Sequence, residues 1–391
     1  MSSPGTPSPN PLPQGGEGFL LPLPLGGEGR GEGVAARLEI DLDAIAANWR
    51  FLRDRHPSGP VAGVVKADGY GLGARKVAAR LYREGCRHFF VAHFAEARAI
   101  RDLLPDAMLA VLNGLIPGTE AEYTATGILP VLGSLGEVDA WSASARRLGR
   151  KLPGLLHVDT GMSRLGLDPR ELAILQADHA RLDGIDLRYV MTHLVSSEVP
   201  DDPMNERQRR RFADARAGLP PTPSSLANSS GIFLAEDFAS DLARPGAALY
   251  GINPTPDRPN PMRPVVRLLA RVLQVRDVAT GETVGYNATW RAPGPSRIAT
   301  VGVGYADGWH RSHSGRGAAF FDGRPVPLVG RVSMDLTTYD VTARPEIGVG
   351  TQLELIGPSV PPDQVAEAAG TNGYEVLTSL GRRFARAYRG A

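Results

Sequence analysis

The sequence has little cysteine and no long apolar run. The single cysteine, Cys86, excludes an intrachain disulfide and a multi-cysteine metal site, and it fits a reducing compartment. No apolar run reaches the roughly 18 residues that cross a bilayer, and the proline-broken FLLPLPL at 19–25 does not resemble an export signal. The formal net charge of +1 creates no strong field for nucleic acid or an anionic membrane. We therefore expect a cytoplasmic protein that binds neither nucleic acid nor membrane.

Lysine is also scarce. Lys and Arg together number 43, and only Lys66, Lys76 and Lys151 are lysines, which leaves 40 arginines. The chain therefore uses arginine wherever a positive charge is sufficient. A lysine at an unusual position is a stronger functional signal here than in an average protein.

The chain divides by composition into three parts. Its 391 residues are enough for two domains. Residues 1–36 are rich in Pro, Gly, Ser and Glu, and GGEG occurs twice, so we predict a low-complexity, disordered tail. We predict one domain over 37–262 and a second over 263–391.

The first domain alternates short apolar runs with helical segments such as ARKVAARLYREG (74–85). Apolar runs that lack polar alternation and are separated by helices indicate parallel strands buried on both faces. Eight such units over about 200 residues predict a (β/α)₈ barrel of the TIM type. The eight runs lie at 61–65, 88–93, 108–113, 128–132, 154–159, 187–193, 224–228 and 248–252.

The second domain differs from the first in amino-acid composition and pattern. The segment 265–359 is rich in Val, Thr, Gly and Pro and contains few helical stretches. Runs such as 265–278, 297–305, 325–335 and 351–357 are typical of strands in a mainly antiparallel β domain. We expect a helix over 362–370 and another near the C-terminus.

Catalytic groups of (β/α)₈ barrels lie at the carboxyl ends of the strands. Lys66 follows the first apolar run, and the glycine-rich ADGYGLG behind it returns Tyr70 to the same rim. Two interpretations of Lys66 stay open on this pattern alone. It is either an ion-paired or snorkelling lysine, or an amine of depressed pKa that forms a Schiff base.

Other strand ends supply a matching set of polar groups. Arg164 follows the fifth run, His193 ends the sixth, Asn228 and Ser229 end the seventh, and Arg244 lies beside the eighth. Cationic, imidazole and hydroxyl groups at one rim suit an anionic, ring-containing ligand, and the hydroxyl and turn amides suit a phosphate. Each residue alone is more often structural, but their convergence favours a binding site.

These residues resemble those of alanine racemases. VVKADGYG (64–71) is similar to the family's cofactor-lysine motif, which usually has the form V-V-K-A-N-A-Y-G, and further motifs follow in family order over 37–391. The resemblance implies a fold-type-III, pyridoxal 5'-phosphate-dependent isomerase that interconverts L- and D-alanine. It also implies a role in supplying D-alanine for peptidoglycan.

The resemblance assigns roles within the barrel. Lys66 would carry the cofactor as a Schiff base and act as acid or base on one face of the substrate α-carbon. Arg164 would contact the cofactor and the substrate carboxylate, and Arg244 would hydrogen-bond the pyridine nitrogen. An arginine has no acceptor, so that nitrogen stays unprotonated and the ring is a weaker electron sink. The cofactor-binding set is Lys66, Tyr70, Arg164, His193, Asn228, Ser229, Arg244, Gly246 and Ala247.

Second-domain roles rest on the resemblance alone. Tyr286 in VGYNATW would be the second catalytic residue, opposite Lys66. Tyr305, Met334 and Asp335 would join Arg164 in binding the substrate. In the family these second-domain residues reach the lysine of the partner subunit. The resemblance therefore implies a homodimer with shared active sites and a small amino-acid substrate.

Besides Asp68 and Gly69, which replace the usual Asn and Ala of the lysine motif, the sequence departs from the family pattern at two further sites. His157 stands where the family often has a carbamylated lysine, so Arg164 would be oriented differently, by His157 or by a bound anion. A further phosphate-binding tyrosine near the C-terminus is expected to be replaced around Gly381. One hydroxyl contact to the phosphate would then be missing.

Several alternatives stay open. One is a racemase of broader or different specificity, for example for serine. Another is a fold-type-III amino-acid decarboxylase, which would require a carboxylate in place of Arg244 and a cysteine in the second domain, whereas Cys86 lies in the first. A non-catalytic PLP-binding barrel would lack the second domain. No clustered His/Asp/Glu spacing indicates a metal site, so we expect none.

Overall fold

Near the start of the described residues, a strand leads directly into a helix. The computed structural model describes residues 34–390, so most of the predicted tail lies outside the described residues. β1 (Ala36–Asp41) ends at Asp41, whose carboxylate accepts a hydrogen bond from the amide of Ala44 at 2.8 Å and caps α1 (Leu42–Arg55). Such a cap satisfies an amide that has no partner within the helix.

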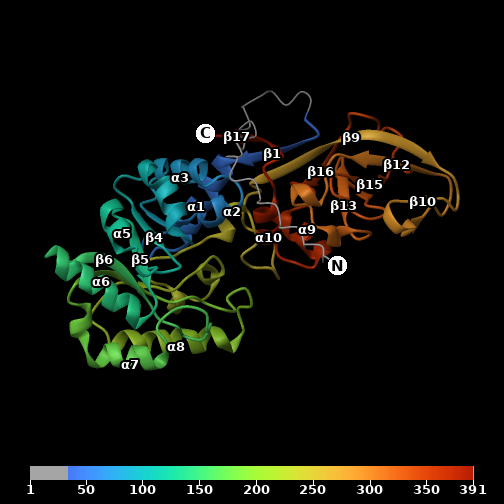
Figure 1. Ribbon diagram of the computed structural model, residues 1–391. Coiled ribbons are helices and arrows are strands. Elements are labelled where there is room, and N and C mark those ends of the chain that lie inside the picture. The colour runs from blue at the N-terminus through green and yellow to red at the C-terminus, as the bar shows by residue number, and fades with distance from the viewer. Residues whose placement is uncertain (1–33, 391) are drawn as a thin grey trace, which may run out of the picture.

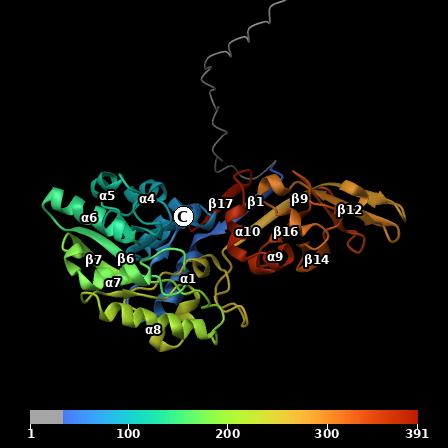
Figure 2. The ribbon, with the colours of Figure 1, turned by 60° about the horizontal axis from the view of Figure 1, so that its bottom comes forward.

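A curved parallel sheet forms the core of the N-terminal domain, and its strands follow chain order. The expected barrel class is confirmed, and helices surround the sheet in both ribbon views (Figure 1, Figure 2). Its strands are β2 (Gly63–Val64), β3 (His88–Val91), β4 (Met108–Val111), β5 (Leu129–Leu132), β6 (Leu152–His157), β7 (Ile185–Met191) and β8 (Ser224–Ser225).

The barrel closes through a segment other than the one expected. Ala243 donates to Pro60 O at 3.1 Å, Ala62 donates to Ala243 O at 2.9 Å, and Arg244 donates to Ala227 O at 2.8 Å. Residues 242–245 therefore occupy the eighth strand position. The expected strand at 248–252 is wrong: Ala247–Tyr250 forms the 3₁₀ helix η5. This run is apolar because the helix is buried, and a short apolar run alone does not distinguish a strand from a buried helix.

The helices lie between the strands. Several are short, and four end at a glycine in the left-handed conformation, which glycine adopts without steric cost. The barrel helices after α1 are α2 (Lys66–Tyr70), α3 (Ala74–Arg83), α4 (Phe94–Ile100), α5 (Glu120–Thr126), α6 (Leu135–Leu148), α7 (Pro169–Ala177) and α8 (Pro203–Ala217). The C-terminal domain carries α9 (Pro362–Ala369) and α10 (Gly373–Ser379).

The C-terminal domain is built on a mainly antiparallel sheet, as expected. The long strand β9 pairs with β1, β12 and β16, and a separate two-stranded hairpin lies at its far tip (Figure 1). The strands are β9 (Val266–Val278), β10 (Thr283–Val284), β11 (Trp290–Arg291), β12 (Ser296–Val301), β13 (Ala318–Phe321), β14 (Arg324–Pro327), β15 (Thr337–Asp340), β16 (Gln352–Ile356) and β17 (Ala385–Arg389).

The first strand of the chain belongs to this second sheet. β1, which the sequence analysis grouped with 37–262, pairs antiparallel with β9 and parallel with β17. Its Leu38 and Ile40 are completely buried. A strand with one apolar face can join either sheet, and the choice depends on partners more than 200 residues away. The chain division at 262/263 itself stays a prediction.

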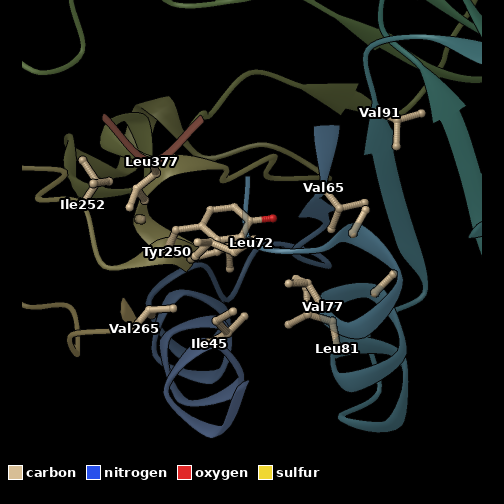
Figure 3. Close-up of a cluster of buried hydrophobic side chains, with 14 of the residues drawn as sticks. Ile45, Val65, Leu72, Val77, Leu81, Val91, Tyr250, Ile252, Val265 and Leu377 are labelled. Atoms are coloured by element: carbon tan, nitrogen blue, oxygen red, sulfur yellow. The ribbon is translucent and has the colours of Figure 1, made fainter. Parts of the chain in front are cut away.

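The two domains meet beside the first barrel strand. Leu377 of α10 and Ile252 lie in the same buried cluster as Tyr250, Leu72 and Val65 (Figure 3). α10 lies at the junction in both ribbon views (Figure 1, Figure 2). The C-terminal helices thereby reach the rim of the barrel that carries Lys66.

Candidate active site

A cavity of about 530 Å³ lies at the carboxyl ends of the barrel strands. Such a volume suits a small organic ligand. All residues expected to bind the cofactor line it, namely Lys66, Tyr70, Arg164, His193, Asn228, Ser229, Arg244, Gly246 and Ala247. Their assignment to a cofactor stays a prediction, but the structure brings them together.

Lys66 begins a turn with unusual backbone geometry. Ala67, Asp68 and Tyr70 all have φ of 54°, in the left-handed region that non-glycine residues seldom occupy. The turn is held by local bonds: Asp68 accepts from the amide of Ala74 at 2.9 Å, and Gly71 donates to Ala67 O at 2.7 Å. This turn places Tyr70 in the same cavity as Lys66.

The Lys66 amine is half-buried. Burial lowers its pKa, the Arg164 guanidinium lowers it further, and the Glu96 carboxylate partly opposes both effects. Losing water and facing a like charge both disfavour the ammonium form. A larger share of the amine is therefore neutral and able to attack a carbonyl carbon.

One end of the cavity is a cradle of hydroxyl and amide groups. The ring of Tyr70 stacks on Tyr250 with 4.5 Å between centroids, and its hydroxyl points at Gly246. A Cβ added to Gly246 would lie 2.2 Å from that hydroxyl oxygen, so any larger residue would displace Tyr70. Ser229 Oγ accepts from the amides of Gly246 at 3.0 Å and Ala248 at 3.2 Å. These groups suit the oxygens of a phosphate.

Arg244 is almost completely buried, with 5% of its surface exposed. Its guanidinium donates to Ser225 Oγ and to the carbonyl of Thr192, which fixes its plane. Burial lowers the pKa of Arg244 to about 10, so the group stays charged near neutral pH. It offers donors and no acceptor to a ligand in the cavity.

His193 presents a neutral imidazole. Its pKa is lowered to about 3, first by burial and then by the charges of Arg244 and Arg164. Gln208, completely buried on α8, accepts from the amide of Val195 at 2.8 Å and donates to His193 O at 2.9 Å. These two bonds fix the backbone at the strand end that carries His193. The imidazole ring itself is available to pack against a flat ligand.

Arg164 lies on an exposed loop after β6. Asp159 shapes this loop by accepting from the amides of Gly161 and Met162, both at 2.9 Å. Within residues 34–390 the Arg164 side chain has no hydrogen bond or ion pair with another residue. It is free to orient toward a ligand anion.

His157, at the end of β6, is buried near the two active-site arginines. Burial lowers its pKa to about 4, and Arg244 and Arg164 act in the same direction. The position therefore holds a neutral imidazole near neutral pH. Neither a hydrogen bond nor an ion pair joins it to Arg164 among the described residues, so the expected re-orientation of Arg164 by His157 stays a prediction.

Tyr374 is a lining residue that sequence reasoning missed. It lies on the first turn of α10 and lines the cavity together with Thr378. Burial raises the pKa of Tyr374, as do Glu198 and Asp363, so it is a neutral hydroxyl donor. The expected loss of a tyrosine at Gly381 is therefore offset by a tyrosine seven positions earlier. The N-cap Asn372 before G-Y-E-V indicates a helix start just before Tyr374, but it does not indicate that this helix packs at the cavity.

The second-domain residues lie elsewhere. Tyr286 is 67% exposed on η6 (Tyr286–Ala288), directly after β10, which lies at the end of the domain remote from α2 (Figure 1). Tyr305 and Met334 are also exposed, and Asp335 pairs with Arg383 at 2.8 Å. The Lys66 cavity is lined by none of these four side chains. One chain therefore does not bring Tyr286 to Lys66.

Known proteins share both domains of this chain. The family described as alanine racemase, N-terminal domain, matches residues 40–254, and the alanine racemase C-terminal domain family matches 265–388. The chain belongs to the alanine racemase family. It is thus an isomerase, as the sequence analysis expected, and its activity is that of an alanine racemase.

Individual relatives cover nearly the whole chain. An alanine racemase of Acidiphilium cryptum is 56% identical over 349 residues, 89% of this chain and 97% of the relative. One from Methylobacterium nodulans is 52% identical and covers 90% of this chain and 96% of the relative. The crystal structure of alanine racemase from Bartonella henselae, with covalently bound pyridoxal phosphate, has a TM-score of 0.89 at 40% identity. It covers 91% of this chain and 100% of its own.

Residues 34–390 contain no helix that combines the length and apolarity that a membrane crossing requires. No group of three or more His, Cys, Asp or Glu side chains there is placed to hold a metal ion.

Proposed function

We propose that this protein interconverts L- and D-alanine with pyridoxal 5'-phosphate, using Lys66 on one face of the substrate α-carbon and Tyr286 of a partner subunit on the other. The proposal depends mainly on one observation. A half-buried lysine of lowered pKa shares a cavity with a phosphate cradle and a buried arginine. The Bartonella henselae relative, which holds covalently bound pyridoxal phosphate, supports the same cofactor here.

The residues of the cavity fit this cofactor. Tyr70, Ser229 and Tyr374 would supply hydroxyls for the phosphate, and the backbone of Gly246 and Ala247 would border it. Arg244 would donate to the pyridine nitrogen, and His193 would pack beside the ring. When bound, the cofactor accepts the electron pair that remains on the α-carbon after its proton leaves. Arg244 keeps the pyridine nitrogen unprotonated, which limits this electron withdrawal and favours rapid return of the proton.

The chain's own groups then move one proton on each face. The neutral Nζ of Lys66 takes the α-proton of one enantiomer, and the hydroxyl of Tyr286 gives its proton to the opposite face. For the other enantiomer the two roles exchange. Arg164 holds the substrate carboxylate, and Tyr305, Met334 and Asp335 border the substrate from the partner. Acid–base groups of this kind contribute about 10²- to 10⁴-fold to a rate.

The exposed face that carries Tyr286 supports a homodimer. Tyr286, Tyr305, Met334 and Leu336 are large, exposed side chains of one domain. A second copy of the chain that covers this face with its barrel rim would supply the missing half of each site. We further propose that the product D-alanine serves peptidoglycan synthesis and that the enzyme is cytoplasmic.

The substrate assay tests this function directly. Purified full-length protein is incubated with a panel of L-amino acids, with and without added pyridoxal phosphate, and the D-products are measured. We expect cofactor-dependent D-alanine and little D-serine. A higher rate with serine would assign a different specificity, and no D-product with any substrate would overturn the proposal.

A further inference from the structure

The carboxylate of Glu96 links the Lys66 turn to the neighbouring strand. Glu96 lies on the first turn of α4, and its Oε1 accepts from the amide of Ala67 at 2.6 Å. Its Oε2 accepts from the amides of Ala92 at 2.8 Å and His93 at 3.0 Å. One side chain therefore joins the end of β2, directly after Lys66, to the end of β3.

The bond to Ala67 lies where the backbone has a high-energy conformation. Ala67 and Asp68 are non-glycine residues in the left-handed region, with φ of 54° for both. Such residues cost about 1 to 3 kcal/mol each and keep this conformation only when surrounding bonds enforce it. The Ala67 amide belongs to the peptide that follows the Lys66 Cα. Fixing that peptide fixes the direction in which the lysine side chain leaves the backbone.

We propose that Glu96 is a positioning residue for Lys66: its carboxylate holds the strained turn and aims the amine into the cavity. This inference rests on the proposed function of Lys66. Glu96 also raises the pKa of Lys66, against burial and Arg164, so its negative charge has a second effect on the same amine. The hydrogen bond to Ala67 and the negative charge of Glu96 thus both act on the Lys66 amine.

A matched control lies further along the barrel. Glu137, near the start of α6, accepts from the amides of Gly133 at 2.5 Å and Leu115 at 3.3 Å. It joins two successive loops as Glu96 does, but its partners, Leu115 and Gly133, lie outside the Lys66 turn. If Glu96 had only this structural role, removing either carboxylate would have the same consequences.

The experiment compares Glu96→Gln with Glu137→Gln in the full-length protein with added pyridoxal phosphate. The amide is isosteric but cannot accept on both sides. We expect both variants to lose thermal stability to a similar extent. We expect only Glu96→Gln to lower kcat, by about tenfold at a nearly unchanged KM, because a misplaced reacting group slows the chemical step.

Two further measurements isolate positioning. Hydrogen exchange at Ala67 is expected to accelerate at least about tenfold in Glu96→Gln and not in Glu137→Gln, because breaking a hydrogen bond exposes the amide. The pH titration of the visible absorption of the lysine-bound cofactor is expected to shift to lower pH in Glu96→Gln alone, because a negative charge beside Nζ is lost. Glu96→Asp keeps the charge on a shorter arm and serves as a second variant if Glu96→Gln folds poorly.

The outcomes separate this inference from the proposed function. If the unsubstituted protein shows no visible absorption with pyridoxal phosphate, the proposed function fails, and Ala67 exchange still decides whether Glu96 holds the turn. If that absorption is present but the two variants have equal kcat, equal exchange and equal titrations, the role of Glu96 in positioning Lys66 is overturned.

Discussion

The barrel cavity and the exposed face of the C-terminal domain present their functional side chains in opposite ways. In the cavity, Arg244 is 5% exposed and is held by two hydrogen bonds, and Ser229 is 9% exposed and accepts two amides. On the C-terminal face, Tyr286 is 67% exposed and Met334 is 54% exposed. The side chains of the cavity are buried and held by their own chain, whereas Tyr286 and Met334 are largely exposed to solvent.

This difference shows which part of the site one chain completes. Buried, hydrogen-bonded groups keep their geometry before a ligand arrives, which reduces the cost of ordering them on binding. An exposed tyrosine on a two-stranded hairpin has no such support. In the proposed dimer its geometry comes from a second copy of the chain, so the shared site is the first consequence of that proposal to test.

The largest effect is expected from mixing two inactive variants. Lys66→Ala removes both the covalent attachment and one proton-transfer group, so we expect a loss of more than about 10⁴-fold. Tyr286→Phe removes one acid and is expected to cost about 10²- to 10⁴-fold, unequally in the two directions. In a mixed dimer, one site combines Lys66 of one chain with Tyr286 of the other, and both are intact. Activity is therefore expected to return on mixing, measured as D-alanine formation.

The control separates complementation from residual activity. Each variant is unfolded and refolded alone, and then the two are refolded together at equal total concentration. Recovery that depends on co-refolding supports shared sites. If co-refolded protein is no more active than the sum of the separate samples, each site lies within one chain. That result would contradict the proposal that a second copy of the chain supplies Tyr286 to the cavity.

The same two regions differ in how well they could be predicted. The rim of the barrel was predictable because the carboxyl ends of parallel strands meet at one edge, so Lys66 and His193 were placed together from their strand positions alone. Arg244 was placed at the same rim, although its strand was expected at 248–252 and lies at 242–245. The role of Tyr286 opposite Lys66 was not predictable from patterns, because no strand pattern within one chain relates the two residues, and it came from the family resemblance.

The sequence predictions failed where contacts with residues far away in the chain determine the local structure. Where a strand was expected at 248–252, Ala247–Tyr250 forms a 3₁₀ helix, because the chain enters the barrel at 242–245 and then turns at Gly246. β1 joins the second sheet through β9 and β17, which lie at the other end of the chain. Tyr374 reaches the cavity only because α10 packs against the barrel rim. No local pattern contains this information.

A smaller effect is expected from filling the space at the phosphate cradle. In Gly246→Ala the new methyl meets the Tyr70 hydroxyl, so one donor moves away from the cradle. We expect pyridoxal phosphate affinity to fall about 10- to 100-fold, as for losing a charge-assisted hydrogen bond. Equilibrium dialysis or fluorescence titration of the cofactor measures it.

Two further variants test whether contact with Tyr70 causes the loss of cofactor affinity in Gly246→Ala. Gly294→Ala is the matched control, because a Cβ there meets nothing within 4 Å, and it is expected to bind the cofactor normally. In Gly246→Ala combined with Tyr70→Phe, the clash is reduced, so the losses are expected to be less than additive. Full additivity would contradict contact between the two groups.

The smallest effect is expected at His157 and concerns stability in acid. The pKa of His157 is lowered from 6.5 to about 4, so between these values the unfolded chain binds a proton that the folded chain does not. Stability is therefore complete above pH 6.5 and is lost as the pH falls toward 4. At pH 4.5 the loss from this one residue is roughly 2.5 kcal/mol.

His157→Gln removes this proton and keeps a polar side chain of similar size. Urea unfolding at pH 7 and at pH 4.5 gives the loss of stability for each protein, and the loss is expected to be smaller in the variant. Comparing the change with pH, rather than stability at one pH, cancels any packing cost of the substitution. An equal loss in both proteins would show that His157 is as easily protonated as an exposed histidine, and that the barrel rim is less tightly closed around Arg164 and Arg244 than its burial indicates.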